Sequence, residues 1–350
     1  MSIRPFIHHS VPALLLAILV ASCAAPPKAP PPPPPPPPSV PTVSLSPQVV
    51  QAASAYRHYM TRSAAITPDF ADGDGIARAV QMGAAYEPTQ MVRGAIAYAA
   101  VVALQDKAFV DNVRVYARDP AQRREVINEL LKNPAYVAGM PDAPSAAGLV
   151  IANLGSDSQR LYETGKAVKQ SAYDIQKQPW SKADISGREA RLAAAKSVSV
   201  TAMAGDLAET ARLQQNSMAL PNASVSAPPA SPPYTPTVTR GLAIAALAVL
   251  GEARDSDMAT INGLMSEPNI GGCMGSAKLN LYQCLAVARP HYEDAFCLGQ
   301  HALMDTGRCM IRASGLTEPY EARFVPDASS INKGMGKKPP VRKRPARKAT

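Results

Sequence analysis

Apolar residues follow a helical period along most of the chain. Between Ser44 and Gln215 they recur every three or four positions, the spacing that places them on one face of an α-helix. The first such face carries Val49, Val50, Ala53, Tyr56 and Met60. Alternating runs of β-branched residues, which would indicate strands, are nearly absent. The pattern therefore predicts an all-α fold, an Ala-rich helical bundle.

Proline and polar capping residues mark several helix ends. Asp119 followed by Pro120 is a typical helix start, and Asn133 followed by Pro134 predicts a stop. The predicted helices include residues 91–104, 145–154, 156–178, 186–215 and 241–250. The first and last of these have no polar face and are too short to span a membrane, so we expect both to be buried in the bundle.

Pro-rich and basic segments divide the chain into parts. A stretch from Pro221 to Pro236 separates two helical regions, and the end of the chain lacks an apolar period. The expected parts are a signal peptide at 1–22, a lipid anchor and polyproline spacer at 23–43, a helical bundle at 44–216, a Pro-rich linker or loop at 217–237, a cysteine-containing helical segment at 238–325 and a disordered basic tail at 326–350. The pattern leaves open whether the two helical regions share one core.

The first residues have the features of a secretory signal. Arg4 precedes an apolar stretch that ends at Ala21. The sequence Val20-Ala21-Ser22-Cys23 resembles the lipobox of bacterial lipoproteins, and this resemblance covers only the first 23 residues. It implies that Cys23 becomes the first mature residue and carries the lipid. In that family, Asp after the lipidated Cys favours retention in the inner membrane. Ala24 stands at this position here, which resembles lipoproteins of the outer membrane. The alternative is an ordinary signal peptide cut nearby, in which Cys23 has no role.

Nine consecutive prolines, Pro30 to Pro38, follow the lipobox. Such a run has no backbone donors and a fixed φ, so it forms a stiff polyproline II rod. At about 3.1 Å per residue the rod is roughly 28 Å long. We interpret it as a spacer that holds the body away from the lipid surface. The alternative is a ligand for a proline-binding module.

The net charge of +9 comes from the two ends of the chain. Arg4 contributes one positive charge and the last eighteen residues contribute eight, so residues 5–332 are neutral overall. The eight are Lys333, Lys337, Lys338, Arg342, Lys343, Arg344, Arg347 and Lys348. We expect this basic tail to contact peptidoglycan, anionic lipid or another envelope protein, although a solubilising tail without a partner is the alternative. Nucleic acid is not expected, because the folded part has no basic surplus.

Four cysteines follow the linker, namely Cys273, Cys284, Cys297 and Cys309. An even number in an oxidising compartment predicts two disulfides, and three pairings are open. We favour neighbour pairing, Cys273 with Cys284 and Cys297 with Cys309. A zinc site that includes His291 and His301 is disfavoured, because zinc ligands come in pairs two to four residues apart and these cysteines are eleven or more apart. We therefore expect no metal and no cofactor.

Two aspartates, Asp72 and Asp74, alternate with glycines and suggest a calcium loop. A helix–loop–helix calcium site would need acids at the positions of Phe70 and Gln81. We therefore interpret this stretch as a turn that caps a helix beginning near Ile76.

The other candidates for chemistry are scattered. His58, His291 and His301 have no Ser or Cys nucleophile beside them in the sequence. Glu87, Glu129 and Glu163 could supply the carboxylate pair that glycan cleavage needs, but their spacing indicates nothing specific. Catalysis is therefore not the function that the sequence favours.

Three hypotheses of function follow. The favoured one is a structural or tethering lipoprotein of the cell envelope, anchored to the outer membrane and facing the periplasm, with display on the cell surface as the alternative location. The alternatives are a peptidoglycan hydrolase or its activator, and a carrier for an apolar ligand. A cleft with two carboxylates about 5–10 Å apart would favour the hydrolase. A closed apolar pocket of several hundred Å³ would favour the carrier.

Overall fold

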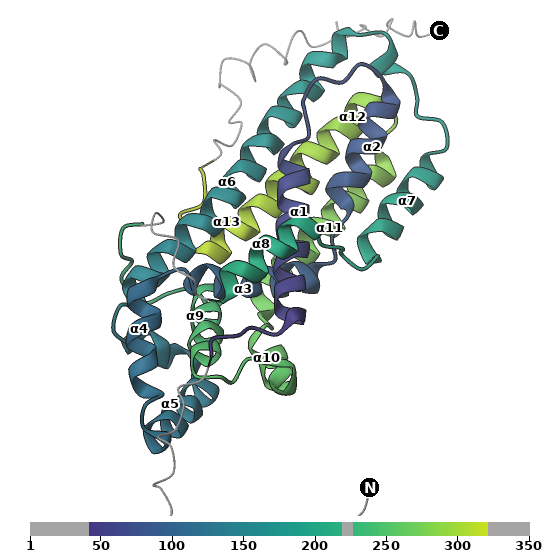
Figure 1. Cartoon of the computed structure of the whole chain (residues 1–350). Coiled ribbons are helices and arrows are strands. Elements are labelled where there is room, and N and C mark those ends of the chain that lie inside the picture. The colour runs from purple at the N-terminus through teal and green to yellow at the C-terminus, as the bar shows by residue number, and fades with distance from the viewer. Residues whose placement is uncertain (1–41, 219–226, 321–350) are drawn as a thin grey trace, which may run out of the picture. The chain divides into compact units, whose positions relative to one another are not determined.

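The computed structural model describes residues 42–218 and 227–320 of the chain. These residues form helices without a β-strand, so the predicted all-α fold is confirmed (Figure 1). The longer helices before the linker are α1 (Pro47–Ala64), α2 (Gly73–Ala84), α3 (Pro88–Ala103), α4 (Lys107–Tyr116), α5 (Pro120–Lys132), α6 (Ala143–Asp174), α7 (Arg188–Val200) and α8 (Leu207–Ser217). After it come α9 (Pro236–Val249), α10 (Met258–Leu264), α11 (Pro268–Val287), α12 (His291–Cys297) and α13 (Thr306–Ser314).

Short helical turns fill some of the connections. They are η1 (Pro134–Gly139), η2 (Ile175–Lys177), η3 (Trp180–Lys182), η4 (Asp255–Asp257) and the π-helical segment η5 (Leu298–Asp305). Because η5 joins α12 to α13 without a break in helical backbone, residues 291–314 form one continuous helical run. No helix among residues 42–218 and 227–320 has both the length and the apolar character to cross a bilayer.

Acidic side chains begin many of the helices. Asp119 accepts hydrogen bonds from the amides of Ala121 and Gln122, and Pro120 occupies the first helical position, as the sequence predicted. Asp72 likewise accepts from the Gly75 amide and caps α2. An anionic cap suits the positive end of the helix dipole and pairs amides that have no partner within the helix.

The two helices without a polar face lie at the centre of the core. Residues 94–103 of α3 and 241–249 of α9 are all buried, as predicted. Their backbones cross closely at Gly241, where a Cβ atom would lie 2.4 Å from the Cβ of Ala99. A hydrophobic cluster from Val43 to Ala313 contains both helices, so the regions before and after the linker contribute to the same core.

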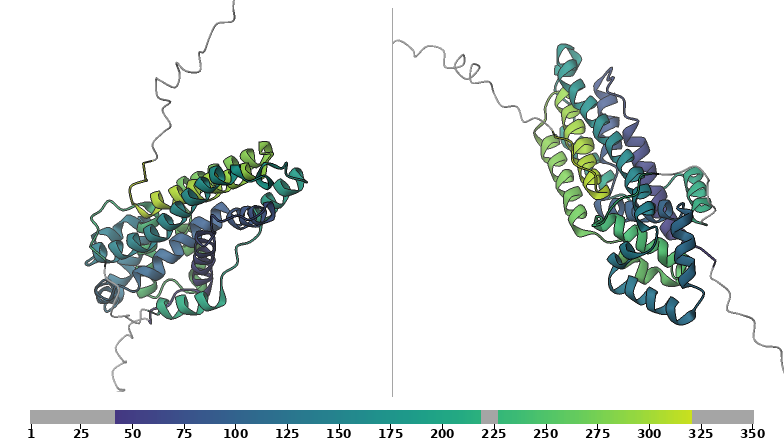
Figure 2. Two further views of the ribbon diagram at one scale, coloured as in Figure 1. Left: turned by 90° about the horizontal axis from the view of Figure 1, so that it is seen from above. Right: turned by 90° about the vertical axis from the view of Figure 1, so that its left-hand side faces the viewer.

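The long helix α6 packs lengthwise against the run from α12 to α13, and both views in Figure 2 show these elements side by side. Glycines permit the close contact, because a Cβ atom on Gly299 would lie 2.4 Å from the Lys169 amide nitrogen. A Cβ atom on Gly165 would lie 2.7 Å from the Met304 amide nitrogen. The C-terminal helices are therefore fixed along most of the length of α6.

Two predicted helix boundaries are wrong. Residues 145–154 and 156–178 were expected as two helices but belong mainly to α6, which continues through Gly155. A Cβ atom at Gly155 would lie 2.3 Å from the Leu316 side chain, so this glycine serves close packing and does not end the helix. Residues 186–215 were expected as one helix, but α7 ends at Val200 and α8 begins after Asp206. The chain between them crosses α1, where the Ser54 hydroxyl donates to the Asp206 carbonyl.

Candidate functional site

The lipidation candidate, Cys23, and the rod Pro30–Pro38 lie outside the described residues. The eight basic residues of the tail, from Lys333 to Lys348, also lie outside them. The structure describes the helical part of the chain between these segments, here called the body, including the residues at its two ends.

The four later cysteines form two disulfides, but not between neighbours. Cys273 is bonded to Cys309, and Cys284 is bonded to Cys297. The predicted neighbour pairing fails because Cys273 and Cys284 lie on the single helix α11, eleven residues and about 16 Å apart along its axis. Disulfide-bonded Cα atoms are at most about 7 Å apart. The two bonds therefore join α11 twice to the helical run that starts at α12.

The segment before α1 is packed and hydrogen-bonded against the rest of the fold. Val43 and Leu45 are buried, ahead of the first helix. The Ser46 amide donates to the Ala253 carbonyl over 2.7 Å, and the Ser46 hydroxyl donates to Asp255. Residues that precede α1 are thus attached to the loop after α9.

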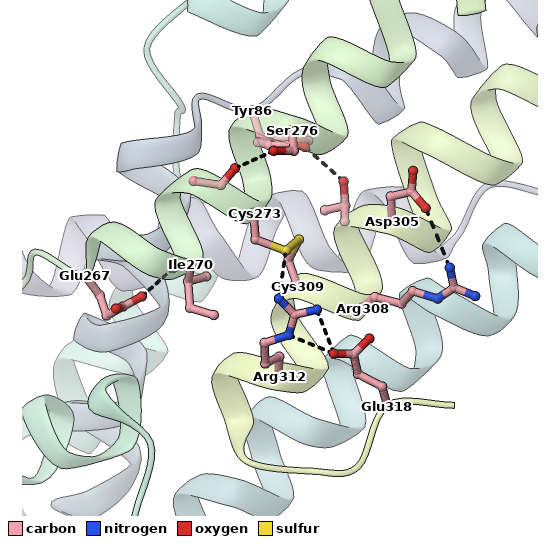
Figure 3. The surroundings of a disulfide bond; sticks show 12 residues. Tyr86, Glu267, Ile270, Cys273, Ser276, Asp305, Arg308, Cys309, Arg312 and Glu318 are labelled. Atoms are coloured by element: carbon pink, nitrogen blue, oxygen red, sulfur yellow. Dashed lines mark hydrogen bonds and ion pairs between the residues drawn. A yellow bond between two sulfur atoms is a disulfide. The ribbon is translucent and has the colours of Figure 1, made fainter. Parts of the chain in front are cut away.

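The C-terminal attachment is centred on the Cys273–Cys309 disulfide (Figure 3). Arg312, one turn after Cys309, forms an ion pair of 2.7 Å with Glu318 beyond the end of α13. Its guanidinium also lies 3.8 Å from the Cys273 sulfur. The last described helix is therefore held to α11 by a covalent bond and to the following residues by charge.

A buried amine, that of Lys278, lies between α11 and α2. Its nitrogen donates to the Ala84 carbonyl, at the last turn of α2, and to the Ser199 hydroxyl over 3.0 Å. It also lies over the Tyr86 ring. Burial lowers the pKa of Lys278 to about 7, an effect that the charge of Glu87 partly opposes.

The burial of Lys278 was not recognised in the sequence, although the signal was present. Met274, Lys278, Leu281 and Leu285 recur at four, three and four positions, the spacing of one helix face. All four are buried. The position of Lys278 on an apolar face thus indicated a buried amine.

Two arginines of α7 bind the C-terminal end of α11. Arg188 donates to the carbonyls of Ala286 and Ala288, and Arg191 donates to the carbonyl of Leu285. These carbonyls lie at the negative end of the helix dipole, where cations are stabilising. Arg191 also forms a buried ion pair of 2.6 Å with Asp294 of α12. Burial raises the pKa of Asp294 to about 6, although the Arg191 charge opposes the rise.

A third buried charge group joins α1 to α6 and α8. Arg57 pairs with the buried Asp157 and, over 3.2 Å, with Glu209, and it lies over the Tyr98 ring. The hydrogen bond and charge of Asp157 raise the pKa of Arg57 above its ordinary value despite its burial. These charges satisfy one another, which is the arrangement of a structural group.

The histidines do not form a site together. His58 lies 3.4 Å from an Arg62 nitrogen, and His301 lies 2.8 Å from an oxygen of Asp305. The His291 ring is 6.4 Å from the Trp180 ring and tilted by 48° to it. Within residues 42–218 and 227–320, no three His, Cys, Asp or Glu side chains are grouped to hold a metal ion.

The three glutamates considered for glycan cleavage are on different elements. Glu87 caps α3, where it accepts from the Thr89 and Gln90 amides. Glu129 and Glu163 form ion pairs with Lys132 and Lys166 on the exposed sides of α5 and α6. The structure assigns all three to capping or surface pairing.

Three open pockets follow one another along α1. The first, of about 220 Å³, lies beside His58 and Tyr59; the second, of about 490 Å³, shares Arg62 and Met82 with it. The third shares Ala55 and Met203 with the first. Asp69 and Asp72 both line the second pocket, but Asp72 is engaged in capping α2. Asp69 and Asp72 therefore do not form a free pair of carboxylates in the second pocket.

Comparison with protein-family models, curated proteins and solved structures gives no match. We therefore argue the function from the residues of this chain alone.

Proposed function

We propose that this chain is a lipid-anchored tether of the cell envelope. Cys23 would hold one end in the outer membrane, and the rod Pro30–Pro38 would space the body from the lipid. The basic tail would contact the carboxylates of peptidoglycan at the other end. The body between them has to transmit force from one attachment to the other.

The Cys273–Cys309 disulfide is the observation that supports this proposal best. Terminal elements are generally the first to detach from a domain, since they are fixed on one side only. Cys309 belongs to the last described helix before the tail, and its disulfide joins that helix to α11 in the interior of the fold. Tension on the tail could unwind only residues 310–314 of α13 before it reached the covalent bond at Cys309.

The N-terminal attachment supports the same function. Tension from the lipid would reach the body at Val43 and Leu45, which are buried. The Ser46 amide then passes it to the backbone at Ala253, on the loop after α9. Both attachments thus lead into one core.

No specific observation favours the two alternatives. A hydrolase would need a free pair of carboxylates, and Asp72 in the second pocket is a helix cap. A carrier would need a closed apolar cavity, and the three pockets along α1 are open to solvent. We therefore retain the tether as the proposal.

The test is co-sedimentation with purified peptidoglycan sacculi. Protein without its first 23 residues is compared with a variant in which Arg342, Lys343, Arg344 and Arg347 are changed to Gln. The matched control changes four exposed cations of the body to Gln, namely Arg118, Arg124, Lys177 and Lys182.

We expect the parent protein to pellet at low salt and to be released at high salt, because exposed charges are screened. The tail variant should lose most of the pelleting, while the control keeps it. Equal pelleting of the tail variant and the parent protein would contradict the proposal.

A further inference from the structure

A separate pocket lies on the Cys284–Cys297 disulfide. It has a volume of about 420 Å³ and is formed by the C-terminal ends of α6 and α11 together with α12. That volume is within the roughly 300–1,000 Å³ of small-ligand sites. The disulfide fixes α12 against α11, so the pocket is already formed in the folded chain.

Aromatic side chains are concentrated around this pocket. Aromatic residues make up only 5% of the chain, yet Tyr173, Tyr292 and Phe296 all line it. The rings of Tyr173 and Phe296 are 6.2 Å apart and nearly perpendicular, at 74°. Tyr173 remains 49% exposed although it is a large hydrophobic residue. The two rings meet at nearly a right angle, and the exposed Tyr173 ring can present a face to a ligand.

Polar groups at the same pocket are few and have defined roles. Glu293 and Gln176 line it, and a Glu293 oxygen accepts the Arg289 amide over 2.8 Å. The second Glu293 oxygen and the Gln176 amide group are suited to hydrogen bonds with hydroxyl or acetamido groups. Apolar ring faces with a polar edge match a pyranose, which presents C–H groups on its face and hydroxyls around its rim.

The position of Lys169 disfavours a cationic ligand on the Phe296 ring. The Lys169 ammonium lies 5.8 Å from the centre of the Phe296 ring, which is the position that a bound alkylammonium would take on that ring. Lys166 and Lys169 also line the adjacent pocket, which shares Tyr173. A neutral ring stacked on Tyr173 does not have to displace the Lys169 ammonium from the Phe296 ring.

We propose that the pocket at Tyr173, Tyr292 and Phe296 binds a neutral pyranose ring of an envelope glycan, stacked on Tyr173. The partial positive charge of the sugar C–H groups is attracted to the negative face of the aromatic ring. That the glycan is the amino-sugar strand of peptidoglycan rests on the proposed function. The pocket would then add a weak contact that salt does not reduce, insufficient alone to retain the protein on sacculi, to the salt-sensitive contact of the tail.

The test is calorimetric titration of the protein without its first 23 residues with the trimer of N-acetylglucosamine. A second titration uses a lipopolysaccharide core oligosaccharide, which carries pyranoses from the membrane surface. The variants are Tyr173→Ala and Tyr173→Phe. Tyr136→Ala is the matched control, because Tyr136 is 42% exposed and lies on η1, outside this pocket.

We expect the trimer to bind with unchanged affinity in 0.5 M salt. Tyr173→Ala should weaken it about five- to tenfold, which is the scale of one lost aromatic contact. Tyr173→Phe and Tyr136→Ala should bind as the parent protein does. The site would be overturned if neither glycan binds, or if the trimer binds Tyr173→Ala as well as it binds the parent protein. Binding of the core oligosaccharide alone would overturn peptidoglycan as the source of the sugar.

The same titration separates this inference from the tether. The four-residue tail variant should bind the trimer normally, since the pocket does not involve the tail. Salt-sensitive pelleting without binding of either glycan would overturn the pocket and leave the tether standing. Trimer binding without tail-dependent pelleting would overturn the tether and leave the pocket standing.

Discussion

The ammonium nitrogen of Lys278 lies 3.6 Å from the centre of the Tyr86 ring, inside the core. The amine also donates to the Ala84 carbonyl at the negative end of α2. The ring and the helix end both stabilise the charged form, but burial opposes it more strongly, and the pKa of Lys278 falls to about 7. The charge of this side chain therefore changes near neutral pH.

The first prediction concerns the effect of Lys278 on stability. In the unfolded chain its pKa is near 10.5, so between pH 7 and 10.5 the unfolded state holds a proton that the folded state has released. The free energy of unfolding therefore rises with pH across this window and is lowest below pH 7. Lys278→Met should remove this rise and stabilise the protein most below pH 7. Urea unfolding at pH 6, 8 and 9.5 measures both effects.

A control for this prediction is Lys132→Met, at a lysine whose side chain is 78% exposed on α5. It should leave the pH dependence as in the parent protein. If Lys278→Met and the parent protein show the same slope between pH 7 and 9.5, the amine is not buried as the structure has it.

The second prediction concerns Asp294 and has the opposite sign. Burial raises the pKa of Asp294 from 3.8 to about 6, so between these values the folded state holds a proton that the unfolded state has released. The free energy of unfolding therefore falls as the pH rises through this window. Asp294→Asn should remove that fall, so its stability relative to the parent protein should increase from pH 4 to pH 6. Chemical unfolding at both pH values tests it.

Loss of the ion-pair partner Arg191 should lower the free energy of unfolding more than loss of the charge on Asp294. Arg191→Met leaves Asp294 buried without its ion pair and releases the Leu285 carbonyl. Removal of one member of a buried pair typically costs about 3–5 kcal/mol. We expect Arg191→Met to be that destabilising at pH 7 and less so at pH 5, where Asp294 becomes protonated. Equal losses at the two pH values would contradict this account of the pair.

The third prediction concerns the disulfide pairing and its effect. Trypsin cleaves after Lys278 and Arg308, so a non-reduced digest should release residues 279–308 as one peptide with an internal disulfide, separate from a second product that links Cys273 to Cys309. Neighbour pairing would instead leave all four cysteines in one linked product. Mass spectrometry distinguishes the two digests.

The two bonds should also differ in their contribution to stability. The Cys273–Cys309 bond spans 36 residues and the Cys284–Cys297 bond spans 13. Loop entropy predicts about 4 kcal/mol for the longer loop and about 3 kcal/mol for the shorter. Replacement of each pair by serines should therefore lower the melting temperature more for the longer loop. The opposite order would indicate that contacts in the folded state, and not loop length, determine the contribution.

Local signals in the sequence predicted the parts of the fold that depend on neighbouring residues. Asp119 and Pro120 mark a helix start because the cap and the fixed φ act within one turn. The helices α3 and α9 were expected to be buried because a helix with no polar face has to be covered. Both inferences needed no knowledge of distant residues.

What the sequence did not predict depends on distant contacts or on helix continuity. Gly271, Gly272 and Gly275 weaken the helix pattern around Cys273, so α11 was not recognised as one helix and the cysteine pairing was wrong. The Arg191–Asp294 ion pair joins residues 103 positions apart, and no local period reveals it. The aromatic pocket likewise combines α6 with α12, which meet only in the folded chain.

The last prediction tests the close crossing of α3 and α9. A Cβ atom on Gly241 would lie 2.4 Å from the Ala99 Cβ and 3.1 Å from the Ala99 carbonyl carbon, so Gly241→Ala forces the two buried backbones apart. We expect it to destabilise the protein by about 1–3 kcal/mol, although alanine favours helices. The control is Gly275→Ala on α11, where the new Cβ has no neighbour within 4 Å apart from its adjacent residues and the backbone of its own helix, so only the helix preference acts, stabilising by about 0.5–1 kcal/mol. Thermal unfolding should therefore show opposite shifts for the two variants, and stabilisation by Gly241→Ala would mean that the helices do not cross at this residue.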